Sequence, residues 1–211
     1  MGAMLAAVAV QLVDLVAPAH TVLVTQECQN GIIGPEAVLP QLAEIAGPMK
    51  QAAGRVAAGA RAAGITVVHC LAWHRADGKA VSNNARMLVA PRKLGMLLVP
   101  GSVEADVIPE IGVEDADIVL GRYHGLGPMG GTELDMLRRN LGATTIIGVG
   151  VSVNVGMLSL GLDAVNHGYQ FVLPRDAVAG VPEAYCDDVI EHTFKNIGTV
   201  TDVEAILAAW G

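Results

Sequence analysis

The chain has 211 residues, of which 52% are hydrophobic and only 3% are aromatic. This length favours a single α/β domain that buries a sizeable core. The formal net charge of −8 argues against a nucleic-acid backbone or an anionic membrane as partner, although it leaves a small anionic ligand open.

The N-terminal segment is as apolar as the core of a signal peptide. It lacks the basic residues that such a peptide carries, since the first Lys or Arg of the chain is Lys50, and Asp14 interrupts the apolar run. Because no run of about eighteen uninterrupted apolar residues occurs, we expect no transmembrane span. We predict a single domain over residues 1–211, with residues 1–20 as an N-terminal extension or helix.

The three cysteines, Cys28, Cys70 and Cys186, are odd in number, far apart in sequence and without a CxxC pair. A disulfide framework or a zinc site would need paired or closely spaced cysteines. The pattern instead favours a reducing compartment. We therefore predict a cytoplasmic protein without a metal site.

Short runs rich in β-branched residues recur along the chain and predict five buried strands. These runs are residues 21–25, 65–70, 117–121, 144–150 and 169–174. Between the first two runs, residues 39–64 are rich in Ala and predict helix, with Pro48 marking a helix start or a kink. The connection from residue 71 to residue 117 is only weakly periodic.

The second half of the chain adds four helical segments, residues 132–142, 154–168, 182–198 and 201–210. Capping-box patterns start the first and the last of them, from Thr132 to Asp135 and from Thr201 to Glu204. In the first of these helices, Arg138 and Arg139 are interpreted as part of a solvated face.

The alternation of strands and helices predicts a three-layer α/β/α fold with a mostly parallel sheet of five or six strands. In such a sheet the ligand crevice lies beyond the carboxyl ends of the strands. The residues that follow the strands are therefore the candidates for a functional site: 26–30, 71–74, 122–124 and 151–156.

Three blocks carry a resemblance to a known family: VLVTQECQNG at 22–31, the Gly-rich block at 121–156 and the block at 162–180. Together and in this order they resemble the isochorismatase-like hydrolase superfamily. The resemblance implies an isochorismatase-like α/β/α domain, a small-molecule substrate, no cofactor and a homo-oligomer, either a dimer or a tetramer. It also implies a cis peptide bond between Val151 and Ser152.

Most members of that superfamily are cysteine hydrolases that act on amides with an Asp, a Lys and a Cys at three strand ends. In this sequence the matching positions hold Glu27, Arg122 and Gly156. Gly156 has no side chain that could form an acyl-enzyme, which excludes a thioester at this position. A displaced nucleophile, Cys28 or Ser152, is a weaker alternative, because Cys28 is more simply explained as a small buried hydrophobe.

The isochorismatase branch itself carries a Gly in a G-V-x-x-x-[VI]-G turn, and GVSVNVG at 150–156 has that form. That branch hydrolyses a vinyl ether with a carboxylic acid as proton donor, so the resemblance implies that Glu27 is the acid. Arg122 would anchor a carboxylate. The backbone amides of residues 154–156, with Asn154 as N-cap, would form an anion site.

Further substrate contacts are expected from side chains at the same strand ends: Gln29, Tyr123, His124, Ser152, Asn154 and Val155. His69, on a buried strand, is interpreted as a hydrogen-bonded core histidine. Trp73 and His74 resemble the metal-binding region of nicotinamidases, but Ala72 stands where an Asp is expected, so we expect no metal.

Two functions from different classes follow. The first is a hydrolase of a small carboxylated or amide-like metabolite, with acid catalysis by Glu27 and no cysteine nucleophile. The second is a catalytically degenerate protein that binds a small anion or serves as an oligomeric scaffold. In that case Glu27 is simply salt-bridged to Arg122.

Overall fold

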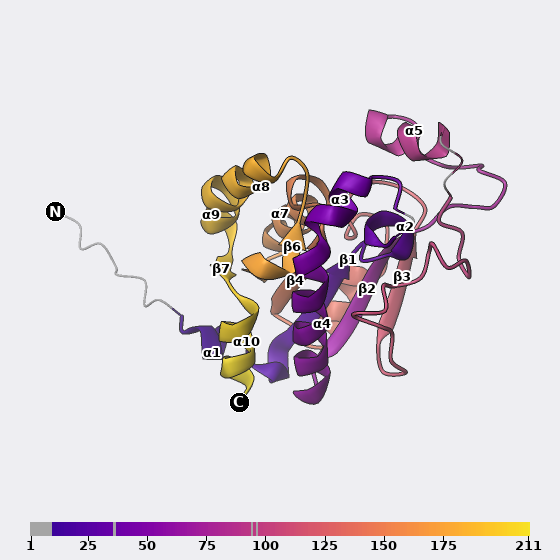
Figure 1. Cartoon of the computed structure of the whole chain (residues 1–211). Helices are drawn as coiled ribbons and strands as arrows, with labels where there is room; N and C mark the ends of the chain where they lie inside the picture. Colours follow the sequence, from indigo (N-terminus) through magenta and orange to yellow (C-terminus); the bar gives the residue numbers. More distant parts are fainter. Residues whose placement is uncertain (1–9, 36, 94, 96) are drawn as a thin grey trace.

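A computed structural model describes residues 10–35, 37–93, 95 and 97–211, and residues 1–9 of the expected N-terminal extension lie outside that range. The chain forms a parallel sheet between two layers of helices (Figure 1). The strand order is β3-β2-β1-β4-β5-β7, and β6 pairs with β4. The strands are β1 Thr21–Gln26, β2 Thr66–Ala72, β3 Ile118–Arg122, β4 Thr145–Val151, β5 Gln170–Pro174, β6 Val178–Ala179 and β7 Thr199–Thr201.

All five predicted strands are present, with ends shifted by at most two residues, and their pairing is parallel as predicted. The sheet of the described chain has seven strands where five or six were expected. The additional strands, β6 and β7, have two and three residues. Runs this short cannot display the alternation by which a strand is recognised in sequence.

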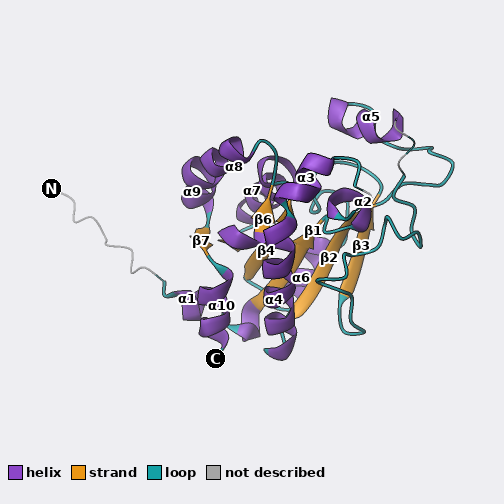
Figure 2. Cartoon of the chain, in the orientation of Figure 1, coloured by secondary structure: helices purple, strands orange, loops and turns teal. Residues whose placement is uncertain are grey.

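The described chain has ten α-helices, distributed over both faces of the sheet (Figure 2). They are α1 Leu12–Leu15, α2 Asn30–Ile33, α3 Pro40–Ile45, α4 Gly47–Ala62, α5 Arg86–Lys93, α6 Leu134–Asn140, α7 Leu158–Asn166, α8 Glu183–Val189, α9 Lys195–Ile197 and α10 Val203–Trp210. Two π-helical turns, η2 Val153–Met157 and η4 Ile190–Phe194, precede α7 and follow α8, and the 3-10 turns are η1 Pro18–His20 and η3 Arg175–Ala177. In the part of the chain that is described, no helix has the length and apolarity to cross a bilayer.

The core lies in two clusters, one on each face of the sheet. Successive side chains of a strand point to opposite faces, so Leu23 packs with α4 and α10, whereas Val22 and Val24 pack with α6, α7 and α8. Pro48 occupies the first turn of α4 and therefore marks a helix start, one of the two interpretations of its place in the sequence.

Both predicted capping boxes are wrong by one residue. The N-cap of α10 is Asp202, whose side chain accepts a 2.8 Å hydrogen bond from the Ala205 N–H. The N-cap of α6 is Glu133, and the Thr132 hydroxyl instead accepts from the Leu134 N–H at 3.2 Å. Sequence reveals that a cap residue is near, but the backbone conformation decides which neighbour takes the position.

The prediction that Arg138 lies on a solvated face is also wrong. Arg138 is fully buried, and its guanidinium carbon lies 3.6 Å from the centroid of the Tyr169 ring. Its Nη2 donates to Met129 Sδ and to Asp135, both at 3.2 Å. Helical spacing places residue 138 one turn after the buried Leu134, and a guanidinium can stack on an aromatic ring. Arg139 is exposed, as predicted.

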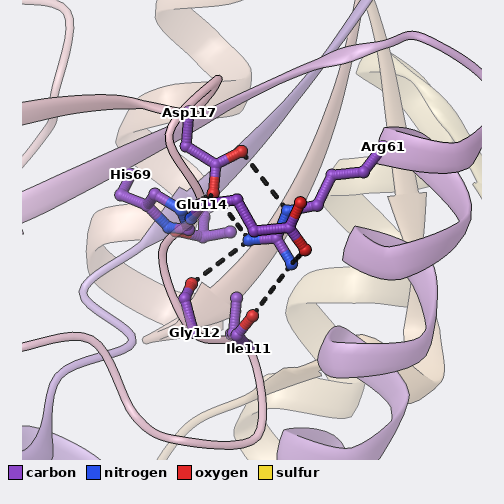
Figure 3. A network of polar contacts seen from close by, with 7 residues as sticks. Arg61, His69, Ile111, Gly112, Glu114 and Asp117 are labelled. Atoms are coloured by element: carbon purple, nitrogen blue, oxygen red, sulfur yellow. Dashed lines mark hydrogen bonds and ion pairs between the residues drawn. The ribbon is translucent and has the colours of Figure 1, made fainter.

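A buried polar network ties the helix layer to the edge of the sheet (Figure 3). The carboxylate of Asp117, just before β3, accepts hydrogen bonds from Arg61 of α4 at 2.7 Å and from the Glu114 N–H at 2.8 Å. It also lies 3.1 Å from His69 Nε2. His69 Nδ1 lies 2.9 Å from the Thr25 hydroxyl. The interpretation of His69 as a hydrogen-bonded core histidine is therefore confirmed.

The network explains the pKa values of its members. Burial raises the pKa of the Asp117 carboxyl, but hydrogen bonds from Arg61, the Glu114 N–H and His69 together lower it below its ordinary value. Burial lowers the pKa of His69 more than the bond to Asp117 raises it. The folded state thus favours an ionised Asp117 and a neutral His69.

We predict that Asp117→Asn lowers the free energy of unfolding by about 3 kcal/mol, because it removes the buried and closer carboxylate partner of the largely buried Arg61 guanidinium and leaves only the exposed Glu114 at 3.4 Å. Urea unfolding followed by circular dichroism measures the change. Glu204→Gln is the control, since it removes the partner of Arg55 from an exposed ion pair and should leave the unfolding midpoint unchanged. Equal stability of the two variants would contradict a structural role for the network.

Candidate active site

A cavity of about 320 Å³ opens beyond the carboxyl ends of β1, β2, β3 and β4. Glu27, Arg122 and Gly156, the three positions singled out in sequence, all line it. They lie together because parallel strands end at the same edge of the sheet.

Glu27 is the first residue after β1, and its φ of +52° is left-handed, a conformation that residues other than Gly rarely adopt. Its N–H donates to the Cys70 carbonyl at 2.9 Å, which holds the turn against the end of β2. Its carboxylate forms an ion pair with Nη2 of Arg122. The turn therefore places the Glu27 carboxylate in the lining of the cavity.

Arg122 is the last residue of β3, and only 5% of its side chain is exposed. Besides the ion pair with Glu27, its Nη2 donates to the Leu126 carbonyl at 3.0 Å. Its Nε and Nη1 are buried and have no hydrogen-bond partner among the described residues. Only Nη2 of the guanidinium is thus held by the described residues, whereas Nε and Nη1 stay available as hydrogen-bond donors.

Gly156 lies within η2, at the start of the helical segment that follows β4. The peptide bond between Val151 and Ser152 is cis, which confirms that prediction. The expected N-cap role of Asn154 is wrong, because Ser152 is the N-cap of this segment. Asn154 lies inside it, and its Nδ2 donates to the Val181 carbonyl at 3.1 Å.

The six expected substrate contacts divide into two groups. Tyr123, His124, Ser152 and Val155 line the cavity, whereas Gln29 and Asn154 do not. Gln29 is fully buried and bonds to both the N–H and the carbonyl of Ala72, at 2.8 and 3.0 Å, and to the Ala105 carbonyl at 2.9 Å. These bonds use the side chain to join β2 to the loop before β3, which corrects its assignment as a ligand contact.

Most of the remaining wall is apolar and comes from segments whose sequence gives no sign that they belong to the site. These side chains belong to α2 and the loop after it, to α3, and to the long connection that contains α5: Ile32, Val38, Leu39, Leu42, Val81, Met87, Leu88 and Leu98. Their sequence neighbourhoods are loops or short helices with no chemical motif. Only the folded arrangement shows that they surround Glu27.

Trp73 and His74 also line the cavity, and His74 Nδ1 accepts a 2.9 Å hydrogen bond from the Leu98 N–H. Burial lowers the pKa of His74. Across the described residues, no group of three or more His, Cys, Asp and Glu side chains is arranged to hold a metal ion. His74 thus has a structural partner in the chain itself.

The cysteines are all buried and free, and none belongs to the described lining of the cavity. Burial and the neighbouring Glu27 charge raise the pKa of Cys28 to about 12, and its sulfur lies 3.7 Å from the Gln26 carbonyl. Burial likewise raises the pKa of Cys70 to about 12. A thiol with such a pKa is a poor nucleophile at neutral pH.

Comparison with known proteins relates the chain to a family. The family model of the Isochorismatase domain matches residues 21–205. The chain is 30% identical to the uncharacterized isochorismatase family protein YecD of Escherichia coli O157:H7, over 90% of this chain and 95% of that protein. It is 31% identical to the ureidoacrylate amidohydrolase RutB of Methylobacterium radiotolerans, over 92% of this chain and 81% of that protein.

A shorter match is 31% identical to the uncharacterized isochorismatase family protein YwoC of Bacillus subtilis, and the chain spans about half of that relative, 54% of its length. Among solved structures, an isochorismatase family protein from Desulfovibrio vulgaris superposes with a TM-score of 0.77 at 24% identity. That superposition covers 88% of this chain and 95% of the other. The common fold is therefore the one that the sequence blocks predicted.

We predict that iodoacetamide does not label the native protein at pH 8. Burial raises the pKa of Cys28 and Cys70 to about 12, so both thiols stay protonated at that pH, and all three cysteines are buried. Intact-mass spectrometry should show no adduct in the time in which urea-unfolded protein gains three. Rapid labelling of one native cysteine would identify an accessible thiol and revive a displaced nucleophile.

Proposed function

Because the chain belongs to the isochorismatase family, we propose that it hydrolyses a small amide-like substrate by proton transfer through Glu27, without a covalent enzyme intermediate. One observation carries this proposal: the ion-paired Glu27 and Arg122 share a cavity with Gly156, which supplies no nucleophile. A carboxyl group and a bound water suffice for hydrolysis in such a site.

The reaction then proceeds by direct attack of water on the substrate carbonyl carbon. As the new C–O bond forms, the Glu27 carboxylate takes a proton from the water. The same proton passes from Glu27 to the leaving nitrogen as the C–N bond breaks, so Glu27 serves first as base and then as acid. Arg122 keeps the carboxylate in place through both transfers.

An amide-like substrate is favoured over a carboxylated substrate for two reasons. RutB, a relative over most of both chains, is a ureidoacrylate amidohydrolase, so amide chemistry occurs within this similarity range. Arg122, the expected anchor for a substrate carboxylate, already shares its charge with Glu27, and the cavity walls are largely apolar. An uncharged substrate with an apolar portion fits these walls better.

The second function, a degenerate protein that binds a small anion or acts as a scaffold, is supported by the same salt bridge between Glu27 and Arg122. Turnover separates the two, because only the hydrolase converts a substrate. The single-domain organisation, the homo-oligomeric state and the cytoplasmic location stay predictions. Size-exclusion chromatography with light scattering tests the dimer or tetramer.

In a screen of apolar amides, ureas and vinyl ethers, we predict that Glu27→Gln lowers kcat of the best substrate by about 10²–10⁴-fold, since it removes the group that moves the proton. Cys28→Ser is the matched control at the next residue, and it should keep most of the activity because its thiol is buried.

The reverse ranking, with Cys28→Ser inactive and Glu27→Gln active, would exclude the proposed mechanism. If no compound in the screen is turned over, the binding or scaffold function gains support. Covalent trapping gives an independent check: mass spectrometry during turnover should find no enzyme adduct, because water is the proposed nucleophile and Gly156 cannot form one. An adduct at Ser152, which lines the cavity, would contradict the proposal.

A further inference from the structure

Gln26, the last residue of β1, is a fully buried polar side chain that the proposed function does not yet use. Neither its Oε1 nor its Nε2 has a hydrogen-bond partner among the described residues. Buried side-chain amides are nearly always hydrogen-bonded, because the unpaired groups lose their contacts with water and gain none in return. An unpartnered amide next to a cavity therefore points to a polar group that arrives from that cavity.

Gly156 is a residue of the cavity wall that lies close to this amide. A Cβ added to Gly156 would lie 2.8 Å from Gln26 Nε2 and 3.2 Å from the Val151 carbonyl oxygen. The direction in which a side chain would leave Gly156 thus points at a donor, Gln26 Nε2, and at an acceptor, the Val151 carbonyl. Gly156 and Val151 line the cavity, whereas Gln26 lies behind them. Because position 156 has no side chain, the Gln26 amide can occupy the space directly behind this part of the cavity wall.

The Gln26 side chain also separates this chain from a thiol-dependent hydrolase. A cysteine at position 156 would bring its Cβ against Gln26 Nε2, closer than an ordinary van der Waals contact. The amide and a nucleophilic side chain therefore compete for one space. The Gln26 side chain in this position therefore requires a glycine at position 156. With no side-chain nucleophile there, the nucleophile would have to be a molecule such as water.

We propose that Gln26 is the positioning residue for the water that attacks the substrate, an inference that rests on the hydrolase function proposed above. Gln26 Nε2 donates a hydrogen bond to the water oxygen, and the water donates one proton to the Val151 carbonyl. Its second proton is directed to the Glu27 carboxylate. The remaining lone pair then faces the substrate carbonyl carbon, where the C–O bond forms, and the proton taken by Glu27 leaves with the departing nitrogen.

The test replaces Gln26 with Met, which keeps the length of the side chain and removes its amide. Loss of an unpartnered amide should leave the unfolding midpoint in urea unchanged or higher. The kcat on an amide substrate should fall by roughly 10²-fold with little change in KM, because a misplaced water slows the chemical step. A higher share of methyl ester among the products in dilute methanol should accompany the fall, since water loses its positional advantage over methanol.

Gln29→Met is the matched control for the stability measurement. Gln29 is as buried as Gln26, but its amide bonds to Ala72 and Ala105. Its replacement should lower the unfolding midpoint clearly, because it leaves backbone groups unpaired. If Gln26→Met loses as much stability as Gln29→Met, or if it keeps full kcat, then Gln26 is a structural residue and the proposal is wrong.

A crystal structure at high resolution gives a readout that needs no substrate. We expect an ordered water that bridges Gln26 and the Val151 carbonyl in the unaltered protein and is missing in Gln26→Met. No water at that place overturns the inference, whether or not turnover is found. If the water is present but Glu27→Gln keeps its activity, the proposed role of Glu27 fails, and the failure is distinguished from that of Gln26.

Discussion

A guanidinium or carboxylate that leaves water needs a partner of opposite charge, and this requirement governs both ends of β3. At its amino end, Asp117 is bonded to Arg61 and His69, which ties the edge strand to α4 and β2. At its carboxyl end, Arg122 is paired with Glu27, the residue that follows β1. Because unpaired buried charges are so unfavourable, the two pairs restrict where the edge strand can lie.

The pair at the carboxyl end has a chemical consequence as well as a structural one. It places a carboxylate in a largely apolar cavity, whose other titratable lining side chains include His74, Tyr123 and His124. With a glycine at position 156 and the thiols buried elsewhere, the carboxylate is the natural candidate for proton transfer. The arrangement is consistent with hydrolysis by water, and position 156 provides no side chain for a covalent route.

Two buried glutamines near this site illustrate how position decides the role of one residue type. The side-chain amide of Gln29 forms hydrogen bonds with backbone groups through both its oxygen and its nitrogen, and it thereby holds the loop before β3 against β2. Gln26, three residues earlier, has none of these contacts and lies behind Gly156. The first contributes to stability through hydrogen bonds, and the second is held by packing alone. The role of a buried glutamine therefore depends on the partners that the fold brings to it.

Local periodicity predicted the five longer strands and their parallel pairing, and the geometry of parallel strand ends predicted that residues 26–30, 122–124 and 151–156 converge. The family resemblance then singled out Glu27, Arg122 and Gly156 within these ranges. Tertiary structure alone decided the burial of Arg138, the backbone contacts of Gln29 and the unpartnered amide of Gln26. The apolar wall from α2, α3 and the α5 connection also emerged only on folding. A local pattern encodes which face of an element is buried, but it does not encode which distant side chain lies opposite, and that contact sets the role of a polar group.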